Sequence, residues 1–425
     1  MFLRQLWKPV LHRMVTGQWE RFLMQPRPVP FPGQMHNPGL YLHVPFCKEL
    51  CPYCPYNKIK FDETLYRSFI TAIHQEIDQY AAHVPGQSYT SLYIGGGTPT
   101  IVPEGLVNMV GHIRRNFNIT GDICVELHPA AMDDTCLDTL KRSGVTMVSI
   151  GVESTDDHIL EIIGRRHDGP TAVDAVRRAV AAGFDAVNVD LMFALPGQGL
   201  EHLDRDLNRV LDAGADQIST YPMFGFPYTE LGERLGLKGI RRPDDRLTRR
   251  MFDLITRRAK AAGMERCAVW SFIRKPRKKF SSITRHHYIG FGPSGASMTG
   301  DWFYVNTFSV PEYVKALPER RPVTLAMPLT RRHEMAYWLY WSTYEMEIDT
   351  AAFHRLFQVE LDAIFGRLLW APRLLGMVRR VDGRYEIKES AAYFIHKIQN
   401  EYSLNYINRL WGTCRADPWP QEVRL

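Results

Sequence analysis

Long apolar runs, a leader pattern and a paired set of cysteines are all missing from the sequence. No stretch approaches the roughly 20 consecutive apolar residues that span a bilayer, so we expect no membrane span. The N-terminus is mixed and contains arginine, without the apolar core and cleavage site of a signal peptide. Four of the seven cysteines stand alone, which does not indicate a disulfide framework and favours a reducing compartment. We therefore expect a soluble, cytoplasmic protein.

The sequence also lacks a large excess of charge of either sign, because the formal net charge is only +6 over 425 residues. Such a balance permits an acidic ligand but does not indicate nucleic acid as a partner. No dense basic recognition helix, internal repeat or low-complexity segment is present, so we expect no nucleic-acid binding. The hydrophobic fraction of 45% can bury a substantial core, in two domains or in one large domain with appendages.

The remaining three cysteines, Cys47, Cys51 and Cys54, lie close together after the apolar run at residues 40–46. Thiolates at such spacing are typical ligands of an iron–sulfur cluster. With His43 as a fourth ligand, the same residues could instead hold a structural zinc ion. From spacing alone these two interpretations are about equally favoured, and unliganded free cysteines are a third.

Strand-like and helix-like segments alternate through most of the chain. We expect strands at residues 40–44, 91–94, 123–127, 145–151, 184–193, 216–223 and 264–272, and helices at 62–83, 104–117, 132–143, 156–164, 171–182, 202–213 and 244–262. Repeated βα units predict a parallel sheet covered by helices, as an open sheet or a barrel.

The chain is expected to have three parts, divided at residues 1–38, 39–309 and 310–425. The first is an extension, with a helix over residues 1–24 and then a proline-rich extended stretch. The last contains two helices, a hairpin that turns at Asp382-Gly383, and a final helix. This order of elements predicts a helical, winged-helix-like domain.

Several motifs stand where the expected strands end. Glycines 95–97, followed by Thr98, allow a ligand to approach the backbone closely, although a tight turn would also use them. Glu126 and Glu153 end two strands, where a lone carboxylate is usually a helix cap or a solvated charge. Asp190 lies inside an apolar strand, where a charged group is unfavourable unless it is bonded, so we favour a site role for it.

Cys-x3-Cys-x2-Cys with Tyr53 before the last cysteine resembles the signature of radical S-adenosylmethionine (radical SAM) enzymes. The run at residues 41–58, Gly-Gly-Gly-Thr-Pro at 95–99 and Asp-Leu-x3-Leu-Pro-Gly-Gln at 190–198 are similar to oxygen-independent coproporphyrinogen III oxidase and its relatives. The resemblance implies an α/β fold, a partial (β/α)6 barrel with the C-terminal domain over its opening. It also implies a 4Fe–4S cluster on the three cysteines, at which SAM is cleaved to methionine and a 5′-deoxyadenosyl radical.

The same resemblance implies the residues that position the cofactors. SAM would be held by Tyr41, Gly96, Gly97, Thr98, Glu126, Glu153, Arg165 and Asp190. Ser294 and Ala296 would line the site of the substrate or of a second SAM molecule. Glu153 replaces the usual glutamine, and Gly295 replaces a usual alanine. Reduced flavodoxin or ferredoxin is the implied electron donor.

Tyr56 departs from the oxidases proper, which have a fourth cysteine at that place. Three outcomes therefore remain open on a tetrapyrrole or similar planar substrate: oxidation of a porphyrinogen, methyl transfer with two SAM molecules (including the heme-opening type), or heme chaperoning with little catalysis. The chaperones have a histidine-bearing motif near Arg285, His286 and His287. The basic run at residues 274–279 could hold propionates, or could be a solvated face.

Overall fold

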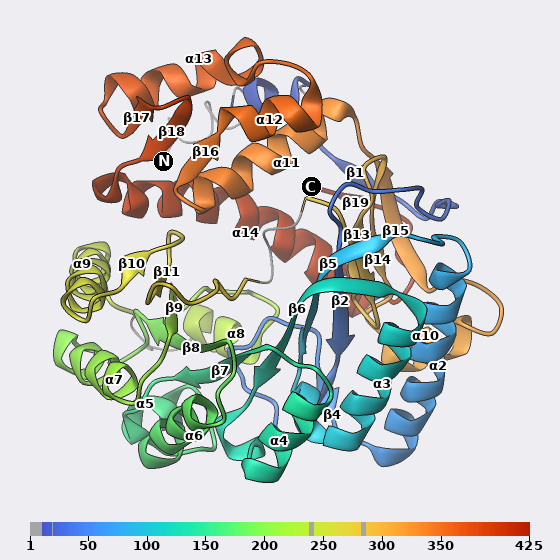
Figure 1. Ribbon diagram of the computed structural model, residues 1–425, viewed down its shortest axis with the longest axis horizontal. Helices are drawn as coiled ribbons and strands as arrows, with labels where there is room; N and C mark the ends of the chain where they lie inside the picture. The colour runs from blue at the N-terminus through green and yellow to red at the C-terminus, as the bar shows by residue number, and fades with distance from the viewer. Residues whose placement is uncertain (1–10, 19, 238–241, 282–285) are drawn as a thin grey trace.

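The structure is a computed structural model, and it describes residues 11–18, 20–237, 242–281 and 286–425. Its centre is one sheet of twelve strands (Figure 1). Six of them are parallel and adjacent in chain order: β2 (Gly39–Val44), β5 (Ser88–Gly96), β6 (Asn118–Leu127), β7 (Met147–Glu153), β8 (Ala186–Phe193) and β9 (Gln217–Pro222). The predicted parallel βα order is confirmed.

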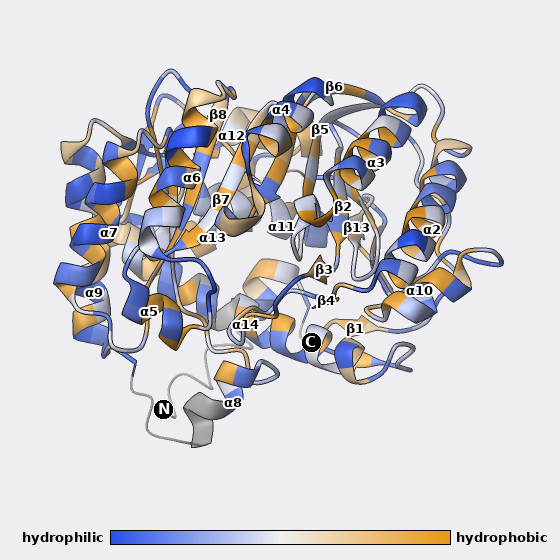
Figure 2. Ribbon diagram, turned by 90° about the horizontal axis from the view of Figure 1, so that it is seen from below, coloured by the Kyte–Doolittle hydropathy of each residue, from blue (hydrophilic) through white to orange (hydrophobic). Residues whose placement is uncertain are grey.

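Amphipathic helices connect these strands and cover the outer face of the sheet (Figures 1 and 2). They are α2 (Glu63–Ala81), α3 (Pro103–Asn116), α4 (Asp134–Arg142), α5 (Asp157–Ile162), α6 (Gly169–Ala181), α7 (Leu200–Asp212) and α9 (Asp245–Ala261). α8 (Glu230–Leu237) instead lies beside the cysteine loop, where the backbone N–H of Leu231 donates to the carbonyl oxygen of Pro52 at 2.9 Å. Asp62 caps α2 by accepting a hydrogen bond from the backbone N–H of Leu65. Among the described helices, none combines the length and apolarity needed to cross a bilayer.

The sheet extends beyond the parallel strands on both sides but does not close. At one edge lie β10 (Glu265–Arg266) and β11 (Ser271–Ile273), antiparallel to each other, where one strand over residues 264–272 was expected. The single-strand prediction is wrong because the chain folds back between them. At the other side follow β12 (Tyr288–Phe291), β13 (Ala296–Met298), β14 (Trp302–Asn306) and β15 (Val323–Pro328). The result is a partial barrel, open between its edges.

After α10 (Val310–Ala316) and β15, the chain forms a helical layer with its own core. Its helices are α11 (Arg331–Tyr344), α12 (Thr350–Phe357), α13 (Leu361–Leu374) and α14 (Ala392–Ala416), and its small sheet consists of β16 (Glu347–Asp349), β17 (Val378–Val381) and β18 (Arg384–Ile387). Ile348, Phe353, Phe365 and Tyr385 are buried in this second core. The hairpin turns at Asp382-Gly383 with positive φ at both residues, as predicted.

The N-terminal segment differs from the expected helix over residues 1–24. Residues 1–10 and 19 lie outside the described part of the chain. Leu23 and Met24 form a strand, β1, that pairs with β19 (Val423–Arg424) from the other end of the chain. The helix prediction is wrong there, because pairing with a distant strand satisfies the backbone. The division into domains at residues 38 and 310 stays a prediction, and β15 continues the main sheet beyond residue 310.

Candidate active site at the strand ends

The cysteine loop follows β2 and is closed by hydrogen bonds. Cys47 ends a short strand, β3 (Phe46–Cys47), which pairs with β4 (Ile59–Lys60) and so draws the two ends of the loop together. Lys58 donates from Nζ to the carbonyl oxygen of Cys54 at 2.7 Å. From α14, Arg415 donates to the carbonyl oxygens of Pro55 and Tyr56, at 2.9 and 2.5 Å.

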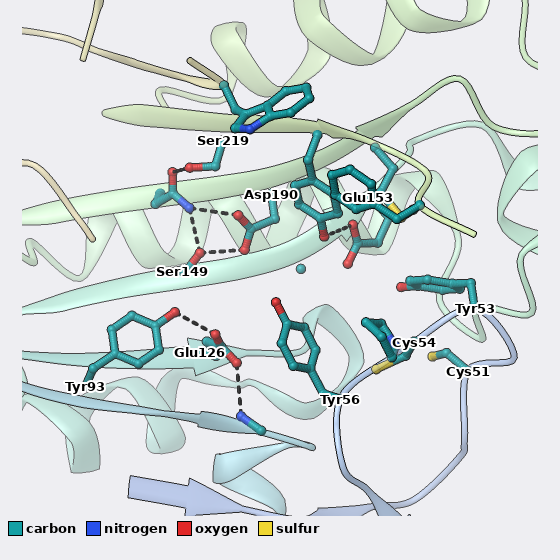
Figure 3. Close-up of a pocket in the computed structure, with 18 of the residues that line it drawn as sticks. Cys51, Tyr53, Cys54, Tyr56, Tyr93, Glu126, Ser149, Glu153, Asp190 and Ser219 are labelled. Atoms are coloured by element: carbon teal, nitrogen blue, oxygen red, sulfur yellow. Dashed lines mark hydrogen bonds between the residues drawn. The ribbon is translucent and has the colours of Figure 1, made fainter. Parts of the chain in front are cut away.

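The loop faces a cavity of about 450 Å³ at the C-terminal ends of the parallel strands (Figure 3). In folds of βα units, active sites lie at this end of the strands. Ten of the predicted site residues line it: Cys47, Cys51, Cys54, Gly96, Gly97, Thr98, Glu126, Glu153, Arg165 and Asp190. Residues from seven described strands and from two helices of the C-terminal part thus line one space.

The three thiols have the wrong arrangement for a single metal ion. Four Zn–S bonds of about 2.3 Å place the sulfurs about 3.8 Å apart. Among the described residues, no set of three ligand atoms that includes these cysteines lies within 4.8 Å. Burial raises the pKa of the Cys47 thiol to about 11, which a bound cation would reverse.

His43 is committed elsewhere, which argues against its role as a zinc ligand. Its Nδ1 lies 2.8 Å from the hydroxyl of Tyr41, and its Nε2 lies 2.8 Å from the carbonyl oxygen of Asn57. The side chain is buried, and burial lowers its pKa to about 4. Both ring nitrogens are therefore used to fix the loop from behind.

The glycine-rich turn after β5 packs directly on the start of the cysteine loop. The backbone N–H groups of Gly97 and Thr98 donate to Val44 and Phe46, both at 2.8 Å. A Cβ at Gly97 would lie 2.6 Å from the carbonyl oxygen of Phe46 and 2.9 Å from Sγ of Cys47. Glycine is required at this position by close approach rather than by turn geometry.

Three carboxylates on neighbouring strands share the cavity (Figure 3). Glu126 accepts from the hydroxyl of Tyr93 at 2.5 Å and from the backbone N–H of Gly96 at 3.2 Å. Burial raises the pKa of Glu126 and of Glu153, and burial together with the charge of Glu153 raises the pKa of Asp190 to about 8. Such proximity of acids in a cleft marks a ligand site.

Arg165 is the cation that offsets this charge. Its Nη2 lies 3.7 Å from Oε1 of Glu153, with both side chains 8% exposed. It also donates to the carbonyl oxygen of Gly151 and, at 3.6 Å, to Sγ of Cys51. The guanidinium therefore links the cysteine loop to the carboxylates.

Glu153 reaches the cavity through an unusual backbone conformation. Its φ is +66°, in the left-handed region, beside an irregularity in the pairing of β7 with β8. Non-glycine residues in this region are held by their surroundings and gather at functional sites. The hydroxyl of Tyr221 donates to its Oε2 at 2.8 Å.

A chain of small polar side chains behind Asp190 was missed in the sequence. Ser219 donates to Asn188 at 2.9 Å, Asn188 donates to Ser149 at 2.6 Å, and Ser149 donates to Asp190 at 2.7 Å (Figure 3). The three residues come from β9, β8 and β7. In the sequence, Ser149 and Asn188 each stand between apolar residues of their strands, and this pattern could have indicated them.

Aromatic side chains of the cysteine loop and of distant segments line the cavity, and those of the distant segments were missed in the sequence. They are Tyr53, Tyr56, Phe224, Phe226, Trp270, Phe280, Tyr340, Trp341, Tyr344 and Trp411. The ring of Tyr56 lies 5.9 Å from that of Trp411 on α14, and in Figure 3 its hydroxyl points between Glu126 and Glu153. Nothing local in the sequence connects α11 and α14 to the cysteine loop.

Three predicted residues do not line this cavity. The side chain of Tyr41 lies behind it, bonded to His43 and 6.1 Å from the ring of Tyr93. Ser294 lies in the turn between β12 and β13, where its backbone N–H donates to the carbonyl oxygen of Thr307, and Ala296 begins β13.

The basic run at residues 274–279 is paired with carboxylates and carbonyls of this chain. Lys275, Arg277 and Lys278 form ion pairs with Glu265, Asp216, and both Asp122 and Asp185. Lys279, which lines the cavity, pairs with Glu345 at 2.6 Å. Arg285 lies outside the described residues, and His286 and His287 do not line the cavity. The run does not present free cations to a ligand.

Comparison with known proteins places this geometry in a class. The family model of the radical SAM superfamily matches residues 41–210. The chain is 28% identical over 287 residues to the heme chaperone HemW of Bacillus subtilis, covering 66% of this chain and 76% of the relative. It is 26% identical over 318 residues to the oxygen-independent coproporphyrinogen III oxidase of Cereibacter sphaeroides, covering 70% and 69%. The match to the HemW of Mycobacterium tuberculosis covers 61% of that relative, at 30% identity.

The structure of coproporphyrinogen III oxidase (HemN) from Escherichia coli has the same fold, with a TM-score of 0.75, 21% identity and 92% of each chain covered. The protein is therefore a radical SAM protein by fold and domain. Its sequence is similar to those of the oxygen-independent coproporphyrinogen III oxidases and of the HemW heme chaperones. A radical SAM domain supports an enzyme and implies a 4Fe–4S cluster and SAM.

Proposed function

We propose that the protein is an enzyme that binds a 4Fe–4S cluster on Cys47, Cys51 and Cys54 and cleaves SAM to act on a planar tetrapyrrole. One observation carries the proposal: three thiols, a buried arginine and three carboxylates open into the same cavity, whose far walls are aromatic. The cluster and SAM together supply an electron transfer that yields methionine and a 5′-deoxyadenosyl radical. The electron would come from reduced flavodoxin or ferredoxin in the cytoplasm.

Arg165 and the carboxylates divide the polar groups of SAM between them. The guanidinium of Arg165, next to Cys51, would bind the carboxylate of SAM, because a planar fork of donors suits that group. Glu126 would accept from the amino group of SAM, with Gly96, Gly97 and Thr98 lining the same end. Asp190 and Glu153 would accept from the ribose hydroxyls.

The aromatic half of the cavity suits a flat macrocycle. Trp270, Trp341 and Trp411 offer ring faces for stacking, and they exclude water from the radical side of the cavity. Lys279 is already paired with Glu345, so the described part of the wall offers few charges to several propionates. This favours a macrocycle with few carboxylates over coproporphyrinogen.

Heme chaperoning is the second candidate, since relatives named heme chaperone HemW align with 66% and 55% of this chain. Methyl transfer is the third, and it would need a second SAM molecule. Ser294 and Ala296, which were expected to line the site of the substrate or of a second SAM molecule, do not line the described cavity.

Anaerobic reconstitution followed by product analysis tests the proposal. The protein is incubated with dithionite, SAM and either heme, coproporphyrinogen or no macrocycle, and products are followed by mass. We expect 5′-deoxyadenosine together with an altered macrocycle. Heme binding in the Soret region with no SAM cleavage would support the chaperone and overturn the enzyme, and S-adenosylhomocysteine would indicate methyl transfer.

A further inference from the structure

A second group of metal-ligating side chains lies away from the cavity. His286 and His287 precede β12, and Glu334 is in the first turn of α11. One ligand atom from each lies within 4.8 Å of the others, and in the described part of the chain no other three His, Cys, Asp or Glu side chains meet this criterion. None of them lines the cavity, so the group is independent of the cysteine loop.

These side chains are sequestered from solvent without being satisfied. The side chains of His286 and Glu334 are 12% and 18% exposed. Nδ1 of His286 and both ring nitrogens of His287 are out of reach of solvent and have no hydrogen-bond partner of normal geometry. Buried polar atoms in native proteins are nearly always paired, so three such atoms in two adjacent rings need an explanation.

The protonation state of His287 is the one that a metal ion requires. Burial, with smaller contributions from the charges of His286 and His36, lowers its pKa to about 4, and a hydrogen bond to the backbone of His36 acts in the opposite direction. The imidazole is thus neutral at pH 7, with a lone pair available for coordination. Glu334 supplies the negative charge that faces both rings.

We propose that His286, His287 and Glu334 bind a divalent transition-metal ion of the zinc class. Two imidazoles and a carboxylate form a preferred ligand set for Zn²⁺, with a fourth position open to water. Nε2 of His286 and Oε2 of Glu334 are 3.9 Å apart, compared with about 3.4 Å for tetrahedral bonds of about 2.1 Å. A small rotation of either side chain closes the difference.

Space for the ion is left by a glycine. A Cβ at Gly300 would lie 3.6 Å from Nε2 of His287 and 3.5 Å from Oε1 of Glu334. The absence of a side chain there keeps both ligand atoms open on that side. The ring of Phe357, at the end of α12, closes another side at 5.4 Å from the ring of His286.

The site joins two elements that both shape the active-site cavity. β12 pairs with β2, which leads into the cysteine loop, and α11 supplies Tyr340, Trp341 and Tyr344 to the aromatic wall. A bound ion would hold α11 against the sheet, so it would stabilise the folded protein without taking part in the chemistry.

Zinc binding by the full-length protein tests the proposal. The reconstituted protein is dialysed against excess Zn²⁺, freed of loose metal on a desalting column, and analysed for zinc and iron by mass spectrometry. We expect one zinc per chain in addition to the cluster iron, and a rise in Tm on zinc addition. His287→Gln and Glu334→Gln should each lose the zinc and the Tm rise, while their unchanged iron content reports an intact fold.

Two controls make the outcome decisive. His354→Gln alters a comparable pair on α12, in which Nδ1 of His354 lies 3.1 Å from Glu360 at the surface, and it should keep the zinc. Cys51→Ala should also keep it. If His287→Gln and Glu334→Gln keep the zinc and Cys51→Ala loses it, the ion is bound by the cysteine loop and the proposal is overturned. Wild-type protein that binds no zinc would overturn it as well.

Discussion

Single residues at the strand ends show how closely the cavity is built around its charges. Glu126, Glu153 and Asp190 face one another across a space with Arg165 as the buried cation of the group. Like charges this close raise one another's pKa values, beyond the effect of burial. The cavity thus favours a positively charged ligand, such as the sulfonium and amino groups of SAM.

The substitution Asp190→Asn should reveal the raised pKa of Asp190 as a gain in stability that depends on pH. The folded pKa of about 8 lies above the ordinary value of about 4, so the wild type takes up a proton on folding and loses stability as pH rises from about 4 to 8. The cluster-free variant should gain on the order of 2 kcal/mol relative to wild type between pH 5 and 8, measured by urea unfolding. Asp212→Asn, at an exposed position of α7, should show no such trend. A difference that is constant with pH would contradict the raised pKa.

Gly97→Ala should damage the cysteine loop without changing any thiol. Its methyl group would meet the carbonyl oxygen of Phe46 and Sγ of Cys47 well inside van der Waals distance. Such overpacking costs about 1–3 kcal/mol and should lower the iron bound after reconstitution several-fold. Gly33→Ala, where nothing lies within 4 Å, is the matched control. Full iron content in Gly97→Ala would show that the loop moves aside freely.

At the scale of elements, α14 holds the cysteine loop from the opposite end of the chain. Arg415 donates to two carbonyl oxygens of the loop, and its guanidinium lies 5.2 Å from the centre of the ring of Tyr228. The helix thus works as a clamp as well as a cavity wall. Loop and helix are about 360 positions apart in sequence.

Arg415→Met should loosen that clamp. Hydrogen bonds from a charged donor contribute about 1.5–3 kcal/mol, so the loop should open more often. We expect several-fold faster loss of cluster absorbance under a chelator or air, at nearly unchanged initial iron content. Arg409→Met, on the same helix and bonded only to the exposed Arg424 carbonyl among its described contacts, should behave as wild type. Equal rates of cluster loss in the two variants would show that Arg415 does not stabilise the cysteine loop.

The elements themselves were largely predictable, and the exceptions have physical reasons. Parallel strands that are buried on both faces appear in the sequence as apolar runs between segments of helical periodicity. β2, β5, β6, β7, β8 and β9 were therefore predicted. Of the helix expected over residues 1–24, residues 11–16 are helical, but Leu23 and Met24 instead pair with Val423 and Arg424. Pairing between chain ends leaves no local signal.

The site followed the same pattern at the scale of the whole molecule. Residues that end the parallel strands could be located from the sequence, because their strands bring them to one edge. The aromatic wall from α11 and α14, the positive φ of Glu153 and the pairing of the basic run depend on tertiary contacts that no motif encodes.

The whole molecule therefore presents a partial barrel whose strand ends are covered by a helical layer, with the cysteine loop between them (Figure 1). Both layers contribute to one cavity, so cofactor and substrate would meet in the same enclosed space. The central claim is that Cys47, Cys51 and Cys54 hold a cluster that serves SAM cleavage there.

Anaerobic measurement of 5′-deoxyadenosine from wild type, Cys51→Ala and Cys136→Ala tests that claim most directly, with iron and sulfide analysis on the same samples. Cys136 is buried on α4, away from the loop, and provides the control. The account predicts four irons per chain and SAM cleavage in wild type and Cys136→Ala, and a fall in cleavage of about a thousandfold or more in Cys51→Ala. Wild-type protein that carries zinc without iron at the loop, or Cys51→Ala that cleaves SAM at the wild-type rate, would contradict it.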